Sequence, residues 1–76
     1  MTATRFNEMM LGLLATADEK INVLGFEDAK PYLDKIGEMI DDLEMFWNSD
    51  QIFTDTCWSA VYDDRYVAWQ EEAEAV

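Results

Sequence analysis

Apolar side chains in the first third of the chain recur at the spacing of an α-helix. They follow one another at steps of three, one, three, one, three, four and three residues, which places them on one face of a helix. The members of this stripe are Phe6, Met9, Met10, Leu13, Leu14, Ala17, Ile21 and Leu24. We predict a helix over residues 3–24, with Thr2 or Thr4 as its N-cap and Gly25 as a left-handed residue at its end. Gly12, inside this segment, is expected to mark close packing between helices.

A second set of apolar residues makes a broader helical face. Its members are Tyr32, Leu33, Ile36, Met39, Ile40, Leu43, Phe46 and Trp47. We predict a helix over about residues 29–47 with Asp28 as its N-cap, because Pro31 would then lie in the first turn, where its missing N–H breaks no hydrogen bond. A face this wide is expected to contact more than one neighbouring helix.

The turn-forming residues Asn48, Ser49 and Asp50 precede a third predicted helix over about residues 51–71, for which Thr54 is an alternative start. On a helical wheel Trp58, Tyr62 and Trp69 form an aromatic arc with Tyr66 at its edge, and Cys57, Val61 and Ala68 lie beside it. Residues 72–76 are acidic, and we expect them to fray because negative charge is unfavourable at the C-terminus of a helix.

Together these patterns predict an all-α fold, a small three-helix bundle in which residues 1–76 form a single domain. Half of the residues are apolar and ten are aromatic, which is not the composition of a disordered acidic chain. So small a bundle has difficulty in burying ten aromatic residues and five methionines. Some of them are therefore expected to face a partner, and a homodimer is one form that this partner could take.

The net charge of −12 changes the picture, because it is concentrated in one part of the chain. From Ile36 to Val76 there are eleven acidic residues and a single base, Arg65. The second predicted helix carries a carboxylate stripe of Asp34, Glu38, Asp41, Asp42 and Glu44, with Lys35 as its only cation. Acids at this spacing repeat about every 5 to 6 Å, a distance comparable to that between phosphates of a nucleic-acid strand. The stripe is therefore either a solvated face that maintains solubility or a surface that imitates a phosphate backbone.

These features define the residues that we expect to bind a partner. The carboxylate stripe would engage lysine and arginine groups, joined by Asp63 and Asp64 on the third helix. The rings of Trp58, Tyr62 and Trp69 would anchor the contact or a homodimer, since such residues are enriched at interface hot spots. Core packing is the alternative for these rings. For Arg65, stacking on a neighbouring ring and an ion pair are both open.

Catalytic, metal and cofactor sites are not expected. Histidine is absent and Cys57 is the only cysteine, so a thiolate or imidazole metal site has too few ligands and a disulfide within the chain is impossible. Cys57 has no histidine to activate it, and we interpret it as a small buried thiol. The EF-hand pattern of acids around a glycine is also missing. We therefore predict a protein that is not an enzyme.

The cytoplasm is the expected location. Residues 9–15 are apolar and follow Arg5, which imitates a secretion signal, but the same residues fit an amphipathic helix better. No segment approaches the roughly 20 apolar residues that span a bilayer, and the net charge would be repelled by anionic lipids. We expect neither membrane binding nor direct binding of nucleic acid.

Short length, low isoelectric point, helices and surplus carboxylates resemble the small inhibitors made by bacteriophages and mobile elements. Among these are DNA-mimicking anti-restriction proteins, some anti-CRISPR proteins and proteins that block host polymerases. The resemblance implies a protein that acts in the host cytoplasm and inhibits a nucleic-acid-binding enzyme or complex by occupying its basic surface. The alternative is a helical homo-oligomer or adaptor that uses an aromatic interface, with acidity serving only solubility.

Overall fold

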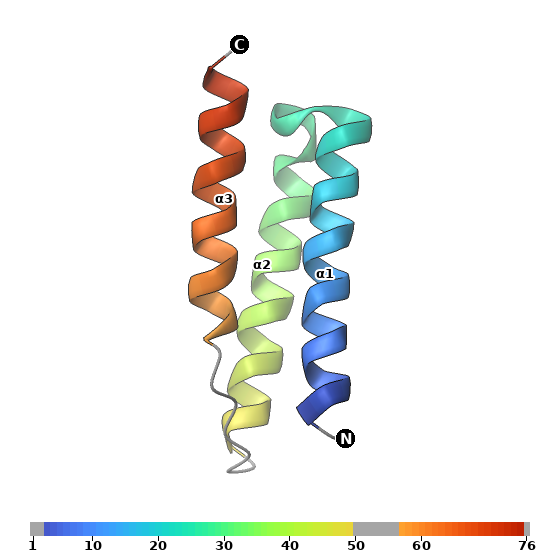
Figure 1. Cartoon of the computed structure of the whole chain (residues 1–76), viewed down its shortest axis with the longest axis vertical. Coiled ribbons are helices and arrows are strands. Elements are labelled where there is room, and N and C mark those ends of the chain that lie inside the picture. The colour runs from blue at the N-terminus through green and yellow to red at the C-terminus, as the bar shows by residue number, and fades with distance from the viewer. Residues whose placement is uncertain (1–2, 50–56, 76) are drawn as a thin grey trace.

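Three helices make up the computed structural model, which describes residues 3–49 and 57–75. They are α1 (Ala3–Leu24), α2 (Phe26–Ser49) and α3 (Trp58–Glu74). In Figure 1, α2 runs antiparallel to both neighbours and lies between them. The body measures 43 × 18 × 18 Å, as expected when its longest helix of 24 residues extends about 36 Å. The predicted all-α fold and three-helix bundle are confirmed.

The core lies where α2 meets its two neighbours. Its buried residues are Phe6, Met10, Leu14 and Ala17 from α1, Phe26, Ala29, Leu33, Ile36 and Ile40 from α2, and Trp58, Tyr62 and Trp69 from α3. The predicted face of α2 is divided by this packing. Leu33, Ile36 and Ile40 are buried, whereas Tyr32 and Met39 are exposed at the surface. The broad face thus serves two helices, as expected, and its edge remains in solvent.

Gly25 forms the connection between α1 and α2 by itself. Its φ of +84° is in the left-handed region that favours glycine, and its N–H donates to the carbonyl of Ile21 at 2.8 Å, which closes α1. The carbonyl of Gly25 then accepts from the N–H of Ala29 at 3.0 Å, which begins α2. One residue therefore ends one helix and starts the next.

The predicted start of α2 near residue 29, with Asp28 as N-cap, was wrong. The helix begins at Phe26, so Asp28 lies within its first turn and Pro31 lies beyond that turn, inside the helix. Pro31 has no N–H to donate to the carbonyl of Glu27, which costs one helical hydrogen bond. The early start carries Phe26 into the core, where it is 6% exposed, and burial of a phenylalanine is worth about 1.5 to 3 kcal/mol.

The bounds of α3 also differ from the prediction. Cys57 is extended, with φ −87° and ψ 98°, so the helix that holds the aromatic arc begins at Trp58. The predicted segment 51–56 and the alternative start at Thr54 lie outside the described residues. At the other end α3 continues to Glu74, and the N–H of Ala75 donates to the carbonyl of Glu71 at 3.0 Å. The glutamates at 72 and 74 are therefore helical, and α3 extends beyond its predicted end at residue 71.

Two further expectations concern α1. Thr4 lies inside the helix and so is not its N-cap, and Thr2 is outside the described residues. Gly12 was expected to mark close helix packing, but a Cβ atom added there would meet nothing within 4 Å. Gly12 is exposed, and its carbonyl accepts a hydrogen bond from the Thr16 hydroxyl at 2.9 Å. Close packing occurs instead at Gly37 of α2.

Candidate partner-binding groove

The N-terminus of α3 is held by a carboxylate that belongs to α2. Glu44 Oε2 accepts a hydrogen bond from the backbone N–H of Trp58 at 2.5 Å. The Ser59 hydroxyl lies 3.0 Å from Glu44 Oε1 and 2.8 Å from Asp41 Oδ1, and its single proton can be donated to either. Cys57, the residue at the N-cap position, makes no capping bond with its own side chain. Glu44 therefore caps α3 from the neighbouring helix, where the helix dipole also favours a negative charge.

One turn further along α3, Tyr62 fixes the distance between the two helices. Its hydroxyl donates to the backbone carbonyl of Leu33 at 2.5 Å. A Cβ atom at Gly37 would lie only 3.1 Å from Cε1 of the Tyr62 ring, so this close approach depends on glycine. Burial, followed by the proximity of Tyr66, Asp34 and Asp63, raises the pKa of Tyr62 to about 12. The hydroxyl thus remains a protonated donor at neutral pH.

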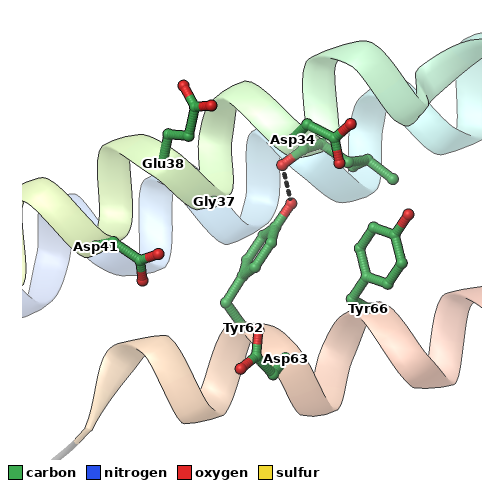
Figure 2. Close-up of a pocket in the computed structure, with 8 residues that line it drawn as sticks. Asp34, Gly37, Glu38, Asp41, Tyr62, Asp63 and Tyr66 are labelled. Atoms are coloured by element: carbon green, nitrogen blue, oxygen red, sulfur yellow. Dashed lines mark hydrogen bonds between the residues drawn. The ribbon is translucent and has the colours of Figure 1, made fainter.

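A groove of about 490 Å³ lies along this contact between α2 and α3. It is lined by Leu33, Asp34, Gly37, Glu38, Asp41, Tyr62, Asp63 and Tyr66. Figure 2 shows the carboxylates of Asp34 and Asp41 along α2 and the two tyrosine rings reaching up from α3. Glu38 points away from α3 and forms the outer edge. The groove combines four carboxylates with a largely aromatic floor.

The structure thus brings together four of the acidic residues predicted to bind a partner: Asp34, Glu38, Asp41 and Asp63. Asp42 and Asp64 are exposed but do not line the groove. Glu44 is half-buried and occupied with the cap of α3. Of the carboxylates predicted to bind a partner, Glu44 therefore caps α3, and the others are exposed at the surface.

Within residues 3–49 and 57–75, the groove carboxylates form no ion pair. Between residues that the structure describes, the one ion pair joins Lys30 to Glu27, with Nζ 3.2 Å from Oε2. Lys30 also lies 5.4 Å from the ring centre of Phe26, and Lys20 lies 4.9 Å from that of Tyr32. Among the described residues, therefore, no lysine or arginine forms an ion pair with a groove carboxylate.

The three rings proposed as anchors are in the core. Trp58, Tyr62 and Trp69 are 7%, 6% and 7% exposed, and the rings of Tyr62 and Trp69 meet edge to face at 6.0 Å. Trp58 Nε1 donates to Asn7 Oδ1 of α1 at 3.3 Å. This burial favours core packing, which is the alternative interpretation of the three rings. Their role as anchors for a partner stays a prediction, and their burial does not support it. Tyr66 lines the groove together with Tyr62, is half-buried and packs edge to face on Phe26 at 5.5 Å.

Two predictions about single residues, Cys57 and Arg65, can now be compared with the structure. Cys57 is exposed, so the interpretation as a buried thiol was wrong. Because α3 begins after Cys57, its side chain does not follow the helical wheel, and Sγ lies 3.8 Å from Glu44 Oε1 at the surface. Arg65 is also exposed, and among the described residues it neither stacks on a ring nor pairs with an acid.

Within residues 3–49 and 57–75, no group of three or more acidic or cysteine side chains is placed to hold a metal ion. In the same part of the chain no helix has the length and apolar character needed to cross a membrane. Three residues of the groove were not among those predicted to bind a partner: Leu33, Tyr66 and Gly37, of which Gly37 is the least expected. Its signal was an unexplained glycine within a strongly periodic helix, four residues after a buried leucine.

Comparison with protein-family models, with curated proteins and with solved structures gave no match. The functional argument therefore depends on the residues and geometry of the groove.

Proposed function

We propose that this chain is a small acidic binding protein that inhibits a nucleic-acid-binding enzyme or complex by occupying its basic surface. The observation that carries this proposal is the uncompensated groove, in which Asp34, Glu38 and Asp41 of α2 are joined by Asp63 of α3. A surface built to neutralise phosphates presents lysine and arginine groups at similar intervals. Such a surface would find its complement here, in the manner of DNA-mimicking phage and anti-CRISPR inhibitors.

The arrangement of the carboxylates supports this proposal because it is fixed by the fold. The α2 acids are held at helical spacing, about 5 to 6 Å apart. Asp63 follows Tyr62, whose hydroxyl is bonded to Leu33 of α2, and the Glu44 cap holds the beginning of α3. A preformed set of charges loses little conformational entropy on binding, and charge complementarity accelerates association.

The alternative function, a homo-oligomer or adaptor with an aromatic interface, has less support. Of the surfaces that it would use, the α3 rings of Trp58 and Trp69 are buried, whereas Tyr32, Met39 and Phe46 of the broad α2 face are exposed. The alternative also holds that the acidic residues serve only solubility. This explanation and the proposal concern the same carboxylates. The experiment must therefore separate the position of the charge from its amount.

Affinity capture from the native host, followed by mass spectrometry, would identify the target. The dissociation constant is then measured at low and high salt, and in competition with the target's own DNA or RNA. We expect affinity to fall steeply with salt and nucleic acid to displace the protein, because both compete for the same basic groups. A dissociation constant that does not change with salt would refute the proposal, as would a ternary complex with nucleic acid bound normally.

A matched pair of charge reversals separates mimicry from solubility. Replacing Asp34, Glu38 and Asp41 by lysine should abolish binding to the target. Replacing Glu71, Glu72 and Glu74 of α3 by lysine changes the net charge by the same amount at a site outside the groove. This second variant should retain most of the affinity. Equal losses in the two variants would mean that only total charge matters.

A further inference from the structure

The polar atoms that line the groove are almost all hydrogen-bond acceptors. Asp34, Asp41 and Asp63 contribute carboxylates, which accept and do not donate when ionised. The Tyr62 side chain is more than nine-tenths buried, with 6% exposed, and its one proton is committed to the Leu33 carbonyl at 2.5 Å. The Tyr66 hydroxyl is the only remaining donor among the lining side chains.

The floor of the groove adds a second requirement. Its apolar lining comes from Tyr62, Tyr66 and Leu33, and the Tyr62 ring fills the space beside Gly37, where an added Cβ would lie 3.1 Å from Cε1. The volume of about 490 Å³ lies in the range of small-ligand sites. A fitting occupant therefore has an apolar or planar body, carries positive charge and offers several N–H donors with no acceptor.

We infer that the groove between α2 and α3 binds the side chain of an arginine that the partner inserts between Asp34, Asp63 and Tyr66. A guanidinium is planar, carries only donors, bonds carboxylates through a fork of N–H groups and stacks on aromatic faces. Lysine offers a compact, strongly hydrated charge that gains little from the tyrosine floor. This inference rests on the proposed function and specifies the group of the basic partner that enters the groove.

The test is a titration of the full chain with Nα-acetyl-L-arginine methylamide, followed residue by residue in amide NMR spectra. Matched probes are the lysine and the citrulline derivatives; citrulline has nearly the same shape as arginine but no charge. We expect saturable shifts confined to the groove, at Gly37, Asp63 and Tyr66, with arginine binding more tightly than lysine and citrulline not binding. Shifts spread over all acidic surfaces, equal binding of arginine and lysine, or no saturation would each overturn the inference.

Neighbouring aspartates supply the matched control. Asp63 lines the groove and Asp64 does not, although both are exposed and each change to asparagine removes one charge. We expect Asp63→Asn to weaken arginine binding about fivefold, which corresponds to the loss of roughly 1 kcal/mol, and Asp64→Asn to change it less than about twofold. Equal effects would overturn the inference.

The failure of this inference can be told apart from that of the proposed function. If the target binds with strong salt dependence but Asp63→Asn and Asp64→Asn behave alike, only the arginine site is wrong. If the arginine probe binds in the groove but the target ignores salt and nucleic acid, only the inhibitory function is wrong.

Discussion

The same substitution, glycine to alanine in the interior of a helix, should change stability in opposite directions at two positions. At Gly12 of α1 an added Cβ meets no atom within 4 Å, so only the helix propensity of alanine changes. At Gly37 of α2 the added Cβ would lie 3.1 Å from Cε1 of Tyr62. That distance is shorter than ordinary van der Waals contact, so the ring or the helix must move.

The magnitudes follow from these two environments. Gly12→Ala should raise the free energy of unfolding by up to about 1 kcal/mol. Gly37→Ala gains the same propensity but overpacks a site where Tyr62 is 6% exposed and held by its bond to Leu33. Overpacking of this kind costs about 1 to 3 kcal/mol, so a net loss of about 1 kcal/mol is expected. For a chain of this size each change corresponds to about 4 to 8 °C in melting temperature.

Urea unfolding followed by far-UV circular dichroism and tryptophan fluorescence would measure both effects. A double-mutant cycle with Tyr62→Phe isolates the cause, because removal of the hydroxyl frees the ring to move away from a new methyl group. The cost of Gly37→Ala should then decrease in the Tyr62→Phe background. Equal stabilisation by Gly12→Ala and Gly37→Ala would show that Tyr62 does not pack against α2 as described, and the reasoning about the groove would fail with it.

Three further predictions test other parts of the site. Glu44→Ala should lower the free energy of unfolding by about 1 to 3 kcal/mol, because the Trp58 amide loses its charged acceptor. The control is Glu38→Ala at an exposed position, which should change the free energy of unfolding by less than about 0.5 kcal/mol. Similar losses for the two variants in urea unfolding would exclude the interhelical cap. The pKa of Tyr62 is about 12 in the folded protein, against 10.0 for a tyrosine exposed to water, so its contribution to stability is complete below pH 10.0 and decreases as the pH rises toward 12. Tyr62→Phe should therefore flatten the alkaline loss of stability, and unchanged slopes would contradict the assignment. Cys57 is exposed and should react with a thiol reagent without denaturant, so full protection in the folded protein would count against its placement.

The fold could be predicted well where local pattern and tertiary packing agree. In α1 the apolar stripe is unambiguous, and both the helical segment 3–24 and the role of Gly25 at its end are as predicted. In α2 the local signals of Asp28 and Pro31 suggested a later start. The earlier start buries Phe26 and Ala29 despite the hydrogen bond lost at Pro31, and it depends on contacts with other helices that a sequence does not display.

The candidate site could also be predicted from the sequence only in part. Asp34, Glu38 and Asp41 share one side of α2 through helical spacing alone, so the sequence could place them together. Which acid of α3 joins them depends on the rotation of that helix, and consecutive residues such as Asp63 and Asp64 differ by about 100° around its axis. The rotation is set by which α3 rings enter the core.

The use of Glu44 as a cap could not be predicted, because capping patterns are recognised within one segment of chain. Here the carboxylate lies on α2. It accepts a hydrogen bond from the backbone N–H of Trp58, 14 residues further along the chain. The sequence therefore presented Glu44 as one more member of the carboxylate stripe. Only the packing of α3 shows that this residue stabilises the bundle, whereas its neighbours remain at the surface.

Carboxylates gathered on two adjacent helices repel one another, and this repulsion opposes the packing of α3 on α2. The contacts that resist it lie beneath the charges: the Tyr62 hydroxyl on the Leu33 carbonyl and the Glu44 cap at Trp58. The free protein therefore holds its charges in an unfavourable arrangement that a cationic partner would relieve. Because a ligand that binds only the folded state stabilises it, occupation of the groove should strengthen the junction between α2 and α3. The contacts that keep the helices together are thus also the ones that hold the groove carboxylates close to one another.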